Sequence, residues 1–319
     1  MAATVSPGPM NEASRRSTGV GAAMLLLLGA ACAHGPGPSA GTIAQVNVMP
    51  DFLAAWNSVR TAPRAEQMAR TRQALLASHP ELFGPEVFGP ASLDRGLERL
   101  LVEMPRLEPK LRALSERMPG ELERSARRFL DEFPELDWAG PAALSLSMSQ
   151  FEAVLRTVAG RRTLVLGLDA IAFYRGPYAP VEPVVHHALA AALLPGWKGP
   201  APAPLWWAVW EEGFPLAAVR TLDPGASDAD LRLSGEGHDP ASLAALARRV
   251  RGALDSTREA DRGALTGAGA PGAAGRWLAL RVAQQVIAER SLHDGARLGG
   301  PQLRAAIDTA LAALERPGS

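Results

Sequence analysis

Apolar residues recur through most of the chain at the three- and four-residue spacing that places them on one face of a helix. The first such segment begins at Asp51, whose carboxylate can cap a helix with Phe52 in its first turn. A longer periodic stretch over 92–118 contains Pro105 and Pro109, which we expect to divide it into shorter helices. The same spacing predicts helices over 65–78, 121–133, 150–158, 181–194, 205–220, 240–256, 273–290 and 301–315.

Two segments near the middle of the chain have the pattern of strands. Residues 144–148 alternate between apolar and small polar side chains, which is typical of a strand with one buried face. Residues 162–169 are almost continuously apolar, as in a strand that is covered on both faces. We therefore expect an α+β fold that is mainly α-helical, with a small central β-sheet, in a single domain over 51–319.

The N-terminal residues have the pattern of an export signal. Arg15 and Arg16 precede an apolar run over 20–31, and Cys32 follows it. This run of about 12 residues is shorter than the roughly 20 residues that a membrane-spanning helix needs. We therefore predict that 1–31 is a signal peptide, which is removed after export.

The residues around Cys32 resemble a bacterial lipobox, in which the cysteine receives a diacylglyceryl group and becomes the new N-terminus. Gly29 departs from that pattern, because leucine is usual three places before the cysteine; the alternative is an ordinary secretory signal with an incidental free cysteine. Residues 32–50, which begin with a stretch rich in Gly and Pro, predict a flexible tether. Because Ala33 stands where a retention signal has Asp, the resemblance implies a lipid-anchored protein of the bacterial cell envelope, at the outer membrane.

The charge balance and the single cysteine exclude several classes of function. The chain has 33 basic and 33 acidic residues, so it has no overall field that would attract nucleic acid. One cysteine cannot form an internal disulfide or a thiolate zinc site. The membrane is therefore expected as a partner through the lipid, and nucleic acid is not expected as a partner.

A pair of histidines and a later pair of glutamates are the main candidates for chemistry. His186 and His187 lie in the helix expected after the second strand, and Glu211-Glu212-Gly213 lies in the next helix. This order resembles the gluzincin-type (His-Glu-x-x-His) zinc metallopeptidases, in particular the predicted zinc peptidases related to gliding-motility lipoproteins. The resemblance covers 129–290 and implies gluzincin-like helices beside the small sheet. It includes Phe133-Pro134, Gly167-Leu168-Asp169, Tyr174-Arg175-Gly176-Pro177 and Arg276-Trp277-Leu278-Ala279-Leu280.

In that family two histidines one helical turn apart bind Zn²⁺, and a glutamate from the next helix supplies a third ligand. The glutamate beside the first histidine takes a proton from the metal-bound water. The resemblance places His186 at the first ligand position and Glu212 at the third. Ala190 replaces the second histidine, and His187 stands at the general-base position. One imidazole and one carboxylate are too few for a stable zinc site, so the motif is degenerate.

The sequence therefore predicts a cell-envelope lipoprotein whose metallopeptidase-like domain is catalytically inactive and serves a binding or structural role. No cofactor is expected, and the ligand would be a peptide, a cell-wall component or another envelope protein. We expect its cleft between the His186 helix and the helix over 205–220.

Two alternatives remain open. The first is an active zinc peptidase that recruits His187, Glu182 or Glu211 as a non-standard ligand, with zinc as its cofactor. The second is an unrelated helical envelope lipoprotein. In that case the two adjacent histidines, which diverge by about 100° on a helix, are structural, one in the core and one at the surface.

Overall fold

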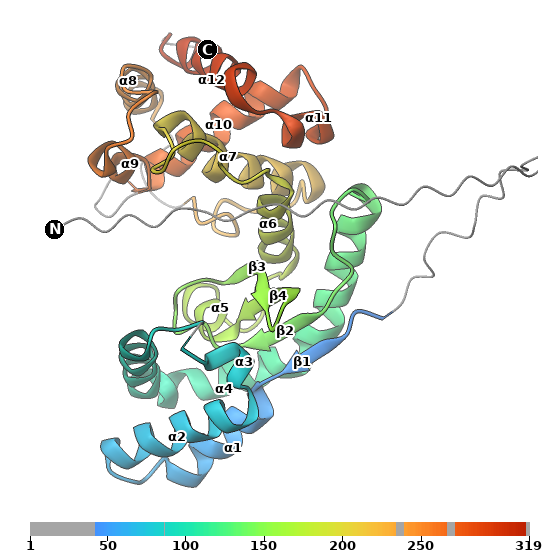
Figure 1. Cartoon of the computed structure of the whole chain (residues 1–319), viewed down its shortest axis with the longest axis vertical. Coiled ribbons are helices and arrows are strands. Elements are labelled where there is room, and N and C mark those ends of the chain that lie inside the picture. Colours follow the sequence, from blue (N-terminus) through green and yellow to red (C-terminus); the bar gives the residue numbers. More distant parts are fainter. Residues whose placement is uncertain (1–41, 86, 234–238, 267–271, 317–319) are drawn as a thin grey trace, which may run out of the picture. The chain divides into compact units, whose positions relative to one another are not determined.

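The computed structural model describes residues 42–85, 87–233, 239–266 and 272–316 (Figure 1). The predicted signal peptide, Cys32 and the tether up to Gly41 lie outside the described residues. Helices predominate around one small sheet, which confirms the predicted α+β class. The helices are α1 (Met49–Val59), α2 (Arg64–Ser78), α3 (Pro80–Phe83), α4 (Pro90–Glu132), α5 (Leu168–Tyr174), α6 (Glu182–Leu193), α7 (Leu205–Leu222), α8 (Pro240–Arg251), α9 (Glu259–Thr266), α10 (Gly272–Ala288), α11 (Leu292–Arg297) and α12 (Gly300–Leu314).

The sheet is mixed, and its four strands lie in the order β1-β2-β4-β3. The strands are β1 (Gln45–Asn47), β2 (Ala142–Ser145), β3 (Ala153–Val158) and β4 (Arg161–Gly167). β2 is parallel to both β1 and β4, whereas β3 is antiparallel to β4. β2 and β4 overlap the two strands that the sequence predicts. β1 and the start of α1 precede Asp51, so regular structure begins within the segment expected to be a tether.

The prediction of a helix over 150–158 is wrong, because residues 153–158 form β3. It pairs with β4 in a hairpin whose register sets Val154 opposite Val165. Ala159 and Gly160, with φ of 47° and 77°, form a two-residue turn whose twist matches that of the flanking strands. The β-branched residues of β3 also favour the extended backbone.

The expectation that Pro105 and Pro109 divide the helix is also wrong, because α4 is one helix of 43 residues. Each interior proline costs about 3 kcal/mol in a helix, but both side chains are exposed. The opposite face of α4 carries an unbroken row of buried leucines and methionines, whose burial offsets this cost. Figure 1 shows that α4 follows a curved path, as helices do when their solvent face is convex. The row comprises Leu93, Leu97, Leu100, Leu101, Met104, Leu107, Leu111, Leu114, Met118 and Leu122.

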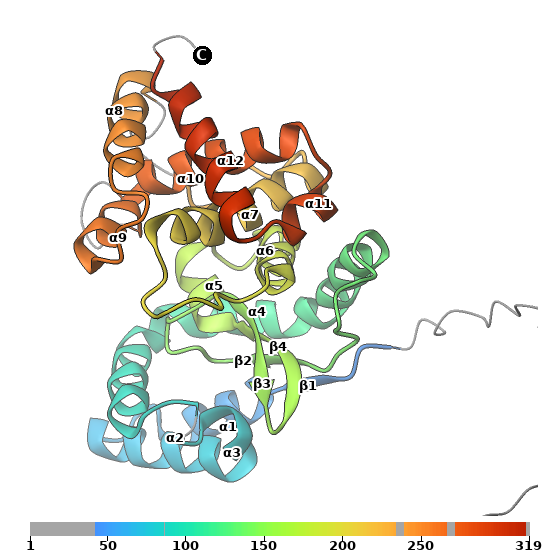
Figure 2. The same ribbon diagram turned by 45° about the horizontal axis from the view of Figure 1, so that its top comes forward.

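α6 lies between the sheet and the C-terminal helices and packs against α4, α7 and β3 (Figure 2). α7 in turn packs closely on α10 at Gly213, where an added Cβ would lie 2.2 Å from the carbonyl oxygen of Ala279. One continuous apolar core joins these elements. None of the helices that the structure describes is both long enough and apolar enough to cross a membrane.

Candidate functional site

His186 lies on the face of α6 that packs against α4, and its side chain is fully buried. Its Nδ1 is 2.6 Å from the Oδ2 atom of Asp223, and its Nε2 is 3.0 Å from the carbonyl oxygen of Ser125. The other carboxylate oxygen of Asp223 accepts a hydrogen bond of 2.9 Å from Arg128. The ring of Phe129 lies against the imidazole, with 5.7 Å between the ring centroids. His186 is therefore part of a closed polar network between α4, α6 and the end of α7.

This network does not suit the ligand role that the resemblance gives to His186. A zinc ligand needs a ring nitrogen whose lone pair is directed at the ion. Both nitrogens of His186 are directed at oxygen acceptors instead. Ala190, one turn further along α6, is buried and has no donor atom.

Glu212, the expected third ligand, has a different partner. Its carboxylate forms an ion pair of 2.5 Å with Arg276 of α10. The close contact of α7 with α10 at Gly213 places the two side chains together. Glu211 and Glu212 line a surface hollow with Glu259. Within the described ranges, no three His, Cys, Asp or Glu side chains are grouped so that they could hold a metal ion.

His187, one residue further along α6, faces a cavity of about 190 Å³. The polar side chains that line this cavity include Glu152 before β3, Arg175 after α5, Arg232 and Arg276. The Nε2 atom of His187 is buried and has no hydrogen-bond partner. Burial, and then the positive charges of Arg276, Arg175 and Arg232, lower the pKa of His187 to about 3. The imidazole is therefore neutral in ordinary buffers and lies in a positive field.

Arg175 is fixed at the wall of the cavity by ion pairing. Its Nε and Nη2 atoms donate to the two carboxylate oxygens of Glu152 at 2.7 and 2.8 Å, and its Nη1 donates to the carbonyl oxygen of Asp230 at 2.5 Å. Asp169 holds the segment that leads to Glu152, since it accepts backbone hydrogen bonds of 2.7 Å from Ser147 and Ser149. Burial raises the pKa of Asp169, and these hydrogen bonds oppose the rise. Asp169, part of the family-like Gly-Leu-Asp segment, thus has a structural role in this fold.

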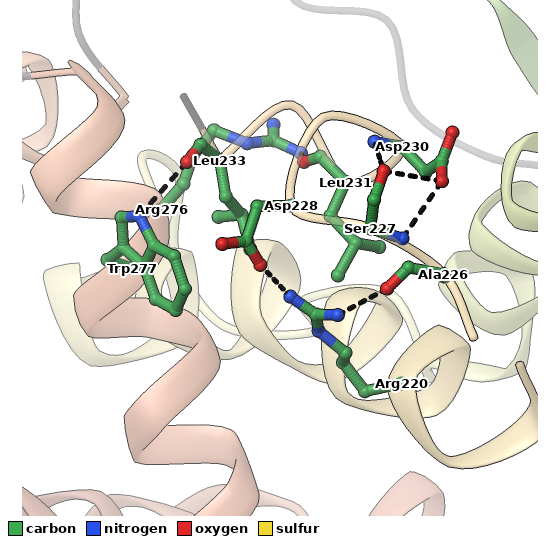
Figure 3. Close-up of polar contacts among 9 residues, drawn as sticks. All are labelled: Arg220, Ala226, Ser227, Asp228, Asp230, Leu231, Leu233, Arg276 and Trp277. Carbon is green, nitrogen blue, oxygen red and sulfur yellow. Dashed lines mark hydrogen bonds and ion pairs between the residues drawn. The ribbon is translucent and has the colours of Figure 1, made fainter. Parts of the chain in front are cut away.

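The loop between α7 and residue 233 forms another wall, and α10 holds it in place (Figure 3). Arg276 donates to the carbonyl oxygen of Leu231 at 3.0 Å, and the indole of Trp277 donates to that of Leu233 at 3.1 Å. Arg220 of α7 donates to the carbonyl oxygen of Ala226. Helices on both sides of the loop therefore fix its backbone.

Arg232 lies between the two carbonyl groups that α10 holds, and it has a left-handed backbone with φ of 53°. A non-glycine residue costs about 1 kcal/mol in this conformation, so the fixed backbone on either side maintains it. Its guanidinium group is exposed and stacks on the ring of Tyr174, 4.4 Å from the ring centroid. The loop thus sets an arginine at the cavity in a conformation that local sequence preference disfavours.

The cavity lies elsewhere than the sequence predicts. The expected cleft between α6 and α7 is filled, because the facing residues of the two helices are buried in the apolar core. α6 lines the cavity with Pro183, Val184 and His187, and α7 contributes no residue to its lining. Of the alternative ligands, only His187 lines it; Glu211 lines the separate hollow, and Glu182 begins α6 outside both linings.

No family model, no curated protein and no solved structure matches this chain. The resemblance to gluzincins thus rests on the residues alone. Arg175 and Arg276 lie in the two segments, 174–177 and 276–280, that carry part of this resemblance, which is a signal for their importance. Arg232 lies in no motif, and sequence reasoning missed it.

Proposed function

We propose that this chain is a lipoprotein of the bacterial cell envelope, at the outer membrane, whose folded domain binds a ligand without hydrolysing it. Its scaffold is metallopeptidase-like with a degenerate metal motif, and its ligand is a peptide, a cell-wall component or another envelope protein. The observation that carries the proposal is the hydrogen bonding of His186 to Asp223 and Ser125 at the place where zinc chemistry needs a ligand.

The surroundings of His187 also favour binding over hydrolysis. A general base works best when its pKa is near the working pH, and a base with a pKa of about 3 takes protons from water poorly. A divalent cation beside this imidazole would lie in the field of the same guanidinium groups, which favours an anion instead. Three features therefore argue against a zinc-activated water: the bonded His186, the weakly basic His187 and the arginines around the cavity.

The lipid anchor is tested by metabolic labelling with a radioactive fatty acid in a bacterial host. Because Cys32 is the only cysteine, a single Cys32→Ser variant decides the result. We expect label in the wild-type chain and none in the variant, together with release of the variant from the membrane fraction. Equal labelling of the two chains, or no label in either, would contradict the anchor.

The absence of hydrolysis is tested on the full chain, purified in a non-ionic detergent with zinc present. We expect no stoichiometric zinc, and no cleavage of a mixture of fluorogenic peptides above the rate with zinc alone. One zinc ion per chain that is lost in both His187→Gln and Glu212→Gln, together with peptide cleavage, would establish the active zinc peptidase instead.

A further inference from the structure

Two side chains that line the His187 cavity each carry a buried nitrogen atom with no hydrogen-bond partner among the described residues. The two atoms are Nε2 of His187 and Nε of Arg276. A buried polar atom without a hydrogen bond costs about 1–3 kcal/mol, so a group that bonds to both would recover this free energy. Because the Arg276 guanidinium can only donate, its partner must be an acceptor.

The charges on the cavity favour an anionic acceptor. Glu152 neutralises Arg175 through two hydrogen bonds, and Glu212 pairs with Arg276. The side chain of Asp230 is turned back on the loop, where it accepts hydrogen bonds from Ser227. Among the described residues, the contact of the Arg232 guanidinium group is with the ring of Tyr174, which leaves its donors open to a ligand. Hydrogen bonds between a guanidinium group and a carboxylate are stronger than those to a neutral acceptor.

The size and walls of the cavity indicate which part of a ligand enters it. Its volume of about 190 Å³ is below the roughly 300–1,000 Å³ of sites that enclose a whole small molecule, so it suits the end of a longer ligand. Phe151, Pro183, Val184 and Leu231 supply apolar surface beside the arginines. A carboxylate that carries a small apolar group matches both kinds of wall.

Exposed aromatic side chains lie next to the arginines along the chain. Phe173 and Tyr174 are 44% and 48% exposed and precede Arg175, and Tyr178 follows at 82% exposed. Tyr174 also stacks on Arg232, so this aromatic surface continues from the cavity. Aromatic groups of this kind can contact a chain that leaves the cavity.

We infer that the His187 cavity binds the free C-terminal carboxylate of a peptide, with Arg232 and Arg276 as donors and with the preceding residues of the peptide over Phe173 and Tyr174. This inference deepens the proposed binding function and rests on it. Arg232 supplies a positive charge that no carboxylate of the described residues pairs with, and Arg276 and His187, which line the same cavity, each have a buried nitrogen that lacks a partner there. Holding that charge at the cavity requires the unfavourable left-handed backbone of Arg232.

The test is a titration of the full chain, in non-ionic detergent, with trialanine and with trialanine amide, followed by calorimetry and by the ring signals of His187 in NMR. We expect the free acid to bind about tenfold more tightly than the amide, because the amide carries no charge. Inorganic phosphate, as a third probe, should bind more weakly than trialanine. Equal binding of acid and amide, or binding of phosphate alone, would overturn the inference.

Arg232→Gly is the decisive variant, because glycine accepts the left-handed backbone and the fold is retained. It should weaken trialanine binding by about tenfold. The matched control is Arg99→Ala, an exposed arginine of α4, which should bind as the wild type does. Unchanged binding by Arg232→Gly, or equal loss in both variants, would contradict the assignment.

The same titration separates the two proposals. If trialanine binds and is cleaved, the non-hydrolytic function fails while the carboxylate site stands. If no probe binds and none is cleaved, the carboxylate site fails while the non-hydrolytic function stands.

Discussion

The two adjacent histidines of α6 have opposite surroundings. His186 is fully buried on the α4 side, and both its ring nitrogens have oxygen partners. His187 faces a cavity lined by arginines, and its Nε2 has no partner. One residue along a helix is a rotation of about 100°, which is enough to move a side chain from a closed network to an open site.

A histidine that a sequence pattern singles out can thus lie in a hydrogen-bonded network of the core rather than at a cavity. A polar network in the core is stabilising when its members have partners, and both ring nitrogens of His186 lie within hydrogen-bond distance of an oxygen atom. An unsatisfied buried atom is the better indicator of a ligand, because the protein loses stability by keeping it. On this ground we propose that the His187 side of α6 is the functional one.

The largest loss of stability should come from removing His186 from its hydrogen-bonded network. His186→Ala removes a partner from the Ser125 carbonyl oxygen and from the Asp223 carboxylate, which keeps its bond to Arg128, and it opens a void beside Phe129. We expect a loss of about 3–5 kcal/mol in the free energy of unfolding, measured by urea denaturation. His187→Ala is the control and should lose about 1 kcal/mol or less, because its Nε2 has no bond to lose. Equal losses in the two variants would remove the distinction between the two sides.

The pH dependence of stability should test the surroundings of His187. The pKa of His187 is near 6.5 in the unfolded chain and about 3 in the folded one, so below pH 6.5 the unfolded state binds the extra proton. Its contribution to stability is thus present above pH 6.5 and is lost as the pH falls towards 3. Between pH 7 and pH 5 the wild type should lose about 2 kcal/mol more than His187→Gln. Parallel pH curves for the two chains would show that His187 titrates normally.

The smallest effect concerns the backbone of Arg232. Arg232→Ala and Arg232→Gly both remove the guanidinium group, but only glycine accepts a φ of 53° without steric cost. The glycine variant should therefore be more stable than the alanine variant by about 1 kcal/mol in thermal or urea unfolding. Greater stability of the alanine variant would mean that the loop does not hold this conformation in solution.

The helices were predictable where apolar residues repeat over several turns, as in α2, α6, α10 and α12, and also in α7, which is buried on almost every side. β3 was not, because Phe151, Val154 and Leu155 also have helical spacing and only the pairing with β4 decides between the two structures. The continuity of α4 through Pro105 and Pro109 was also missed. A rule based on local sequence considers only the hydrogen bond that a proline removes. The long buried face of α4 forms through tertiary packing, which such a rule does not include.

The candidate site was predictable only in part. The His186-His187 pair drew attention to α6, but the sequence could not tell which ring faces a cavity. That choice depends on Asp223 and on the carbonyl oxygen of Ser125, which lie far from α6 in the sequence. The arginines of the cavity come from three separate segments, so no local spacing could have grouped them.

The contrast between His186 and His187 is tested most directly by the nitrogen-15 ring signals of both residues in one NMR sample. The sample is titrated first with trialanine and then with Zn²⁺. We expect trialanine to shift the His187 signals and to leave those of His186 in place. Stoichiometric Zn²⁺ should shift neither. Stoichiometric zinc that moves the His186 signals, with no response of His187 to trialanine, would contradict this expectation.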